Sequence, residues 1–201
     1  DTLITIPLDS NPEQRTRLQN LRHMFADACN AVAETALVHQ CWNRVALHHM
    51  VYREMRERFP DLGSQMICNA VYSVCRACRV VFQNPASPFH SLLAAREKLP
   101  QLRFAPSAPV YFDRHTLSLR RGVLSLYTLE GRMKFRVTLS EAQDKLFQSE
   151  KLKEVSLTEQ AGRFLLQFKL GESESAAVAP PTTSETGNLD LVAYSAAQGR
   201  V

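Results

Sequence analysis

Hydrophobic positions along the chain follow two different periods, and the period changes near residue 100. Between residues 14 and 83, apolar side chains recur every three or four positions, as at Leu18, Leu21, Phe25 and Val32. That spacing is typical of one buried helix face. From residue 101 onward, apolar and polar residues alternate, which is typical of strands with one buried face. The pattern predicts a helical segment followed by a β-rich segment.

Three helices are predicted, each bounded by local signals. The first begins at Ser10-Asn11-Pro12-Glu13, which supplies a capping residue, then proline and an acid for the first turn. The second covers residues 43–59 and ends at Pro60, and its expected inward residues are Val45, Leu47, Val51, Tyr52, Met55 and Phe59. Ser64 is expected to cap the third, whose inward residues are Ile67, Ala70, Val71, Val74, Cys75, Cys78 and Phe82.

Strands are predicted at residues 2–8, 102–104, 110–112, 117–119, 123–129, 133–137, 155–157 and 164–170. Turns are predicted at Glu130-Gly131 and at residues 160–162, and residues 140–149 fit either a short helix or a loop. Because the first strand is separated from the others by residues 10–99, we expect an α+β fold in which a β-barrel carries an inserted helical lobe. Residues 172–187 are a low-complexity linker, and residues 188–201 form a short apolar fragment.

Charge is unevenly distributed along these segments. The chain has 24 basic and 20 acidic residues, a net charge of +4. Residues 11–98 carry 11 bases and 7 acids, residues 99–171 carry 12 bases and 7 acids, and residues 172–201 carry one base and four acids. Arginine dominates the basic segments, and its planar guanidinium suits phosphates and base edges. This distribution favours nucleic acid as a partner over a small-molecule substrate.

Three stretches resemble one family of proteins. Residues 47–79 are similar to the recognition helices of TnpB and the type V CRISPR effectors, which are RNA-guided nucleases. Their sequence is LHHMVYREMRERFPDLGSQMICNAVYSVCRACR. PVYFDRHTLSLRRGVLSLYTLEGRMKFRV resembles their wedge strands, and EVSLTEQAGRFLLQFKLGESE resembles the hairpin that leads to the nuclease domain. The resemblance covers roughly residues 1–175.

This resemblance implies an oligonucleotide-binding-like wedge β-barrel (residues 1–9 and 100–171) with an inserted helical recognition lobe (10–99). A linker (172–187) and a vestigial RuvC strand (188–201) would follow. It implies two partners, a structured guide RNA and target double-stranded DNA, and a cytoplasmic, nucleoid-associated prokaryotic protein. A second copy or a larger nuclease subunit would be a further partner.

The catalytic part of that family is incomplete in this sequence. Asp190 fits the first metal-binding carboxylate of RuvC, but Val192 stands where the family has Gly. The later Glu, the last Asp and the four-cysteine zinc ribbon are absent from the sequence. Cleavage by paired metals requires several converging carboxylates, so no cutting is expected from this chain, and magnesium is expected only with a complete RuvC domain.

Candidate nucleic-acid contacts fall in two groups. In the helical lobe the candidates are Tyr52, Arg53, Arg56, Ser64, Gln65, Asn69, Tyr72, Arg76 and Arg79. In the wedge they are Arg114, Arg120, Arg121, Arg132, Lys134 and Arg136. The alternatives are solvated faces with local ion pairs for the cations, helix capping for the polar residues, and core packing for the tyrosines. Arginines would track phosphates, amides would read adenine edges, and tyrosines would stack on bases.

The cysteines point to structure rather than chemistry. There are five, and Cys75 and Cys78 form a CxxC pair on the apolar stripe of the third helix. A zinc site needs four ligands, so burial of this pair is favoured over metal binding.

Two other functions stay open: a nuclease-dead RNA-guided repressor or accessory subunit, and a protein-interaction module. No apolar run reaches the roughly 18 residues that span a membrane.

Overall fold

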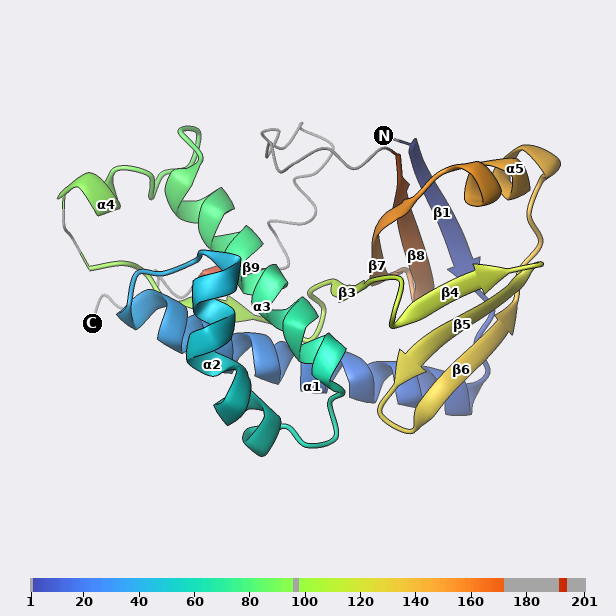
Figure 1. Cartoon of the computed structure of the whole chain (residues 1–201), viewed down its shortest axis with the longest axis horizontal. Helices are drawn as coiled ribbons and strands as arrows, with labels where there is room; N and C mark the ends of the chain where they lie inside the picture. The colour runs from blue at the N-terminus through green and yellow to red at the C-terminus, as the bar shows by residue number, and fades with distance from the viewer. Residues whose placement is uncertain (1, 96–97, 172–191, 195–201) are drawn as a thin grey trace. The chain divides into compact units, whose positions relative to one another are not determined.

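The computed structural model describes residues 2–95, 98–171 and 192–194. The chain forms two compact units. Of the described residues, the first unit comprises 2–22 and 109–171, and the second comprises 23–95, 98–108 and 192–194. The predicted α+β class is confirmed: helices dominate the second unit, and antiparallel sheets dominate the first (Figure 1).

The first unit contains two open antiparallel sheets. One has the strand order β1-β8-β7-β3, from strands β1 (Thr2–Leu8), β8 (Arg163–Leu170), β7 (Leu152–Gln160) and β3 (Val110–Phe112). Figure 1 shows β1 beside β8, although more than 150 residues separate Leu8 from Arg163. The other sheet, here called the hairpin sheet, has the order β4-β5-β6, from β4 (Leu117–Arg120), β5 (Val123–Thr128) and β6 (Gly131–Arg136). In the described residues no strand pairing closes either sheet into a barrel.

The four-stranded sheet buries alternate residues, as the period of two predicts. Ile4, Ile6 and Leu8 of β1 are buried, and so are four positions of β8. Phe164 and Phe168 are fully buried there, and burial of one such side chain stabilises the fold by about 1.5–3 kcal/mol. The sheet core therefore follows directly from the sequence pattern.

Helix α1 (Pro12–Val38) belongs to both units. Its start is fixed by a reciprocal cap: Asn11 Oδ1 accepts from the Gln14 amide N at 2.8 Å, and Gln14 Oε1 accepts from the Asn11 amide N at 3.0 Å. The predicted start at Ser10-Asn11-Pro12-Glu13 is thus confirmed. The boundary at residue 10 between strand and lobe differs from the observed division, because residues 12–22 of this helix pack in the first unit.

The N-terminal part of α1 is held to the four-stranded sheet by Glu159. This carboxylate accepts from Arg15 at 2.9 Å, from Arg22 at 2.5 Å and from Gln19 at 3.2 Å. Both guanidinium groups also lie over the Phe164 ring, with centroid distances of 5.1 and 5.5 Å. The side chains of Arg22 and Glu159 are 6% and 20% exposed, so this ion pair is partly shielded from solvent.

The second unit is built on three helices and a π-helical turn. Helices α2 (Arg44–Arg58) and α3 (Ser64–Cys78) pack together, and η1 (Arg79–Gln83) continues α3. Every predicted inward residue of α3 is buried, and Phe82 of η1 stacks on Trp42 at 5.4 Å between ring centroids. Two local predictions are wrong. Gly63, and not Ser64, is the cap of α3, and Val45 of α2 is 67% exposed.

Smaller elements complete the two units. Helix α4 (Leu92–Ala95) and strand β2 (Leu102–Phe104) belong to the second unit, where β2 pairs with β9 (Val192–Tyr194). The amide side chain of Asn30 bonds both backbone groups of Phe104, at 2.6 and 3.0 Å. Residues 140–149, left open by the sequence, contain helix α5 (Glu141–Ser149) with a capping box at Ser140.

Candidate nucleic-acid interface

The hairpin sheet has one buried face and one basic face, because side chains alternate along each strand. Leu124, Leu126, Met133 and Phe135 are buried on one side. The opposite side, here called the basic face, carries three cross-strand rows. These rows are Arg120–Val123–Arg136, Ser118–Ser125–Lys134 and Tyr127–Arg132. Register therefore gathers onto one face four of the six wedge cations that the sequence predicted.

Local hydrogen bonds fix the hairpin sheet. The Arg17 guanidinium donates to Thr128 Oγ1 at 2.7 Å, beside the β5–β6 turn, and the Tyr127 amide N donates to Thr116 O at 2.8 Å. At the other end, the Val137 amide N donates to Gly122 O at 2.9 Å. A Cβ at Gly122 would lie 3.1 Å from Val137 O, so this close approach favours glycine.

The β4–β5 turn carries an arginine in an uncommon conformation. Arg121 and Gly122 occupy the turn with φ values of 50° and 71°, which is the pattern of a type I′ hairpin turn. Glycine adopts a positive φ without strain, but an arginine there costs about 1 kcal/mol or more. Asn or Asp would be cheaper at that position. A cation at this turn therefore costs stability that Asn or Gly would not.

Within the described residues, the wedge cations form no ion pair with a carboxylate. These cations are Arg114, Arg120, Arg121, Arg132, Lys134 and Arg136. Arg132 instead donates to Ser125 Oγ at 2.8 Å and Ser125 O at 3.0 Å, which lays its guanidinium along the sheet. Arg114 Nε donates to His115 Nε2 at 3.4 Å. An anion would therefore meet cations that form no ion pair with a carboxylate of the described residues.

The arginines predicted to bind nucleic acid in the helical lobe differ from one another in exposure and in protein partners. Arg53 is exposed and forms an (i, i+4) pair with Glu57 at 3.4 Å. Arg56 donates to Leu62 O at 2.8 Å, which ties it to the α2–α3 connection. Arg76 and Arg79 are half-buried at the end of α3 and the start of η1. The structure does not gather these arginines into a face as uniform as that of the hairpin sheet.

The polar and aromatic candidates of the lobe also differ in exposure. Ser64 is exposed and Gln65 is half-buried at the start of α3. Asn69 is 5% exposed, which is at odds with its predicted contact to a base edge. Tyr52 stacks on His48 at 4.7 Å between ring centroids, and Arg44 lies 5.1 Å above the Tyr72 ring. The two tyrosines are half-buried with protein partners.

Three of the five cysteines, Cys29, Cys75 and Cys78, are buried. Burial raises the pKa of Cys75 to about 11 and that of Cys78 to about 12, because a buried thiolate loses its hydration. Cys29 is buried as well, and its pKa is raised to about 12. The predicted burial of the CxxC pair is confirmed. Among the described residues, no three side chains of the metal-ligating types gather into a site, and Asp190 lies outside the described residues.

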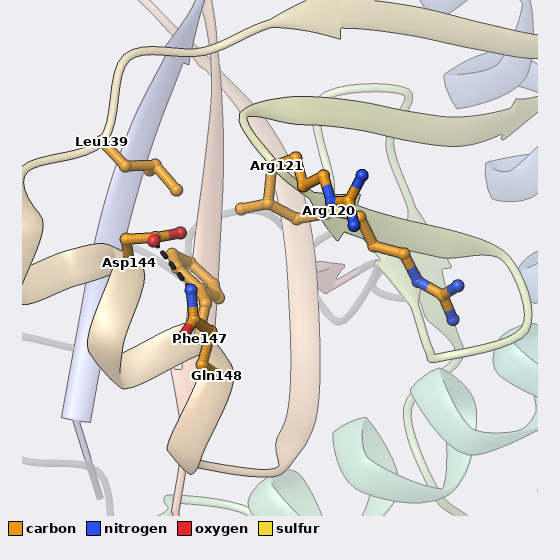
Figure 2. A pocket seen from close by; sticks show the side chains of 7 residues that line it. Arg120, Arg121, Leu139, Asp144, Phe147 and Gln148 are labelled. Atoms are coloured by element: carbon orange, nitrogen blue, oxygen red, sulfur yellow. Dashed lines mark hydrogen bonds between the residues drawn. The ribbon is translucent and has the colours of Figure 1, made fainter.

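Sequence reasoning missed the side chains of α5. Figure 2 shows Asp144, Phe147 and Gln148 of this helix around a pocket that Arg120 and Arg121 also line. No sequence signal selected these residues, because the segment was assigned neither to a helix nor to a loop. The capping box Ser140-x-x-Gln143 was the available signal.

Comparison with known proteins gives no family for this chain. No protein-family model matches it, and no curated protein matches it. In the described residues, no helix has both the length and the apolar character needed to cross a membrane.

Proposed function

We propose that the chain is the guide-RNA-binding and target-DNA-binding portion of an RNA-guided DNA endonuclease of the TnpB or type V kind. The basic face of the hairpin sheet would hold the structured guide RNA. The observation that carries the proposal is the set of cations on and beside this face that have no carboxylate partner in the described residues. The sequence resemblance to wedge and recognition segments supports it independently.

The basic face is an open sheet, and this shape fits RNA better than it fits a groove of duplex DNA. A duplex major groove admits a helix or a two-stranded ribbon, whereas an open sheet presents a flat surface to phosphates and unstacked bases. Arg120 and Arg136 flank Val123 from strands two spacings apart, about 10 Å between backbones. Since no acid lies between them, bound phosphates would relieve their mutual repulsion.

The other parts of the proposal rest on the resemblance. The two sheets of the first unit would form the wedge barrel, and exposed Arg53 with half-buried Arg76 and Arg79 would track a guide–target heteroduplex. Ser64 and Gln65 would lie near the short DNA motif that the related effectors recognise beside the target. Magnesium and cleavage belong to a complete RuvC domain, and the site of action would be the prokaryotic nucleoid.

The test is the salt dependence of RNA binding. A triple variant, Arg120→Gln with Lys134→Gln and Arg136→Gln, removes from the basic face three cations that form no ion pair within the described residues. Each phosphate contact contributes about 0.7 to 0.9 to the slope of log K against log salt. We expect the slope to fall by about 2 to 3 and affinity to fall for all RNA sequences alike.

The matched control removes three cations that already have acidic partners. Arg58, Lys145 and Arg163 pair with Glu54, Glu141 and Asp9 at 3.9, 2.8 and 2.7 Å. Their simultaneous replacement by Gln removes the same formal charge, and we expect the slope to change by less than about 1. Equal slope changes in the two triple variants would show that binding follows net charge and not the basic face.

A second candidate function has one observation in its favour. In the second unit Val38, Val45 and Met50 are 79%, 67% and 49% exposed, and exposed apolar side chains of this size favour protein contacts when they are contiguous. A protein-interaction module would retain its partner after nuclease treatment and at high salt. Loss of all partners under those conditions favours the nucleic-acid proposal.

A further inference from the structure

A pocket lies beside the basic face, between the β4–β5 turn and helix α5 (Figure 2). Its volume is about 450 Å³, inside the roughly 300–1,000 Å³ range of small-molecule sites. Leu119, Leu139 and Phe147 supply its apolar lining. Phe147 is held in place by edge contact with Phe168 at 5.1 Å between ring centroids. The pocket can therefore receive a flat apolar body such as a nucleobase.

One wall of this pocket presents hydrogen-bond acceptors. Gln148 Nε2 donates to Asp144 Oδ2 at 2.8 Å. Because an ionised carboxylate only accepts hydrogen bonds, the amide nitrogen of Gln148 must face Asp144. A carboxylate has about four lone-pair sites, so this single bond leaves acceptor sites on both oxygens of Asp144. The wall is thus suited to a ligand edge that carries two neighbouring donors.

The opposite rim presents cations. Arg120 and Arg121 line the pocket, and in Figure 2 their guanidinium groups extend away from α5. Neither forms an ion pair with Asp144 or with any other carboxylate of the described residues. Anionic groups that leave the pocket on this side would meet both cations. The complementary ligand has a flat body, a donor edge and a phosphate.

Guanine is the base that meets these requirements. Its N1–H and N2–H₂ are adjacent donors, and one carboxylate can accept from both. Adenine and cytosine place a ring acceptor beside their amino group, so Asp144 would face a repulsive lone pair. Uracil places one N–H between two carbonyl acceptors. One matched bidentate contact provides roughly 5- to 150-fold discrimination between bases, equivalent to 1–3 kcal/mol.

We propose that this pocket binds a guanine nucleotide, with the base between Leu119 and Phe147, its donor edge on Asp144 and its phosphates on Arg120 and Arg121. The inference rests on the proposed function for its source, an unpaired guanosine of the RNA that lies on the adjoining basic face. Free guanosine nucleotides have the same chemistry, and the experiment separates the two sources.

The test compares two labelled RNA nonamers, U4GU4 and U4AU4, by fluorescence anisotropy, with GMP and AMP as competitors. The wild-type chain should bind U4GU4 about tenfold more tightly than U4AU4. Asp144→Asn should reduce this preference to less than about twofold. Glu141→Gln is the matched control, since it removes a carboxylate from the same first turn of α5, and it should keep the preference.

Each result decides the inference. Absence of a guanine preference in the wild-type chain overturns it without recourse to any variant, and a preference that survives in Asp144→Asn overturns it also. If GMP binds as tightly as U4GU4, the ligand of the pocket is a free nucleotide. That result overturns the inference that the guanosine belongs to the bound RNA. If RNA binds the basic face without guanine preference, only the pocket assignment fails. If GMP binds but no RNA does, the proposed function fails instead.

Discussion

The anchor between α1 and the four-stranded sheet gives the sharpest prediction for stability. Glu159→Gln keeps the size of the side chain and removes its charge, which leaves the Arg22 guanidinium without its counter-charge. Exposed ion pairs contribute about 0–1 kcal/mol, and loss of one partner of a fully buried pair costs about 3–5 kcal/mol. Glu159 is 20% exposed, Arg22 is 6% exposed and Arg15 is 34% exposed. We therefore expect a loss of about 2 kcal/mol in the free energy of unfolding at pH 7.

The same ion pair predicts a dependence on pH. Burial, the largest single influence, raises the pKa of Glu159, but hydrogen bonds from Arg15, Arg22 and Gln19 and the charge of Arg22 together lower it below 4.5. A lowered pKa stabilises the folded state above the unfolded value and loses that contribution as pH falls through the folded value. The difference between the wild type and Glu159→Gln should be constant above about pH 5 and should shrink below pH 4.5.

The assay is urea unfolding of both proteins between pH 7 and pH 3. Glu141→Gln is the control, because its partner Lys145 is 74% exposed and an exposed (i, i+4) pair contributes only about 0.3–0.5 kcal/mol. Equal effects of the two substitutions at pH 7 would refute the buried-anchor reasoning. A Glu159→Gln effect that does not shrink in acid would refute the assignment of charge as its cause.

Two further predictions concern the turn and the thiols. Arg121→Asn should raise the free energy of unfolding by up to about 1 kcal/mol in thermal unfolding, since Asn tolerates the positive φ of a type I′ turn. The same variant should bind RNA more weakly in anisotropy titrations. A destabilised variant would contradict the strain argument. A thiol reagent at pH 8 should modify half-buried Cys41 before Cys75 and Cys78, whose pKa values of about 11 and 12 keep them protonated. Mass spectrometry of timed samples would show the order of labelling. Early labelling of Cys78 would contradict its burial.

Alternation and local caps made much of the fold predictable. The strand at residues 2–8 agrees with β1, and those at 102–104 and 110–112 agree with β2 and β3. In these segments every second position is apolar or β-prone, so burial and propensity indicate the same structure. Val45 does not follow this rule, because its spacing predicts burial and its side chain is exposed. In α2 this residue lies outside the buried stripe formed by Leu47, Val51 and Met55.

Long-range contacts were beyond the sequence pattern. Glu159 was only a polar residue before a turn, and its partner Arg22 is 137 positions away. The division of α1 between two units could not be predicted, because its apolar stripe is continuous across residue 22. The wedge cations were predicted as a group, but the common face of Arg120 and Arg136 depends on a register that the Arg121-Gly122 turn fixes. That RNA occupies this face stays a prediction.

The most direct test of the central claim is the RNA that copurifies with the protein. The chain and its triple variant, Arg120→Gln with Lys134→Gln and Arg136→Gln, would be purified from a host that carries the neighbouring locus, and the extracted RNA would be sequenced. We expect one enriched RNA with a defined fold and a variable end on the wild-type chain, and its loss from the variant. Bulk host RNA removed at moderate salt, in equal amounts from both proteins, would contradict guide binding by the basic face.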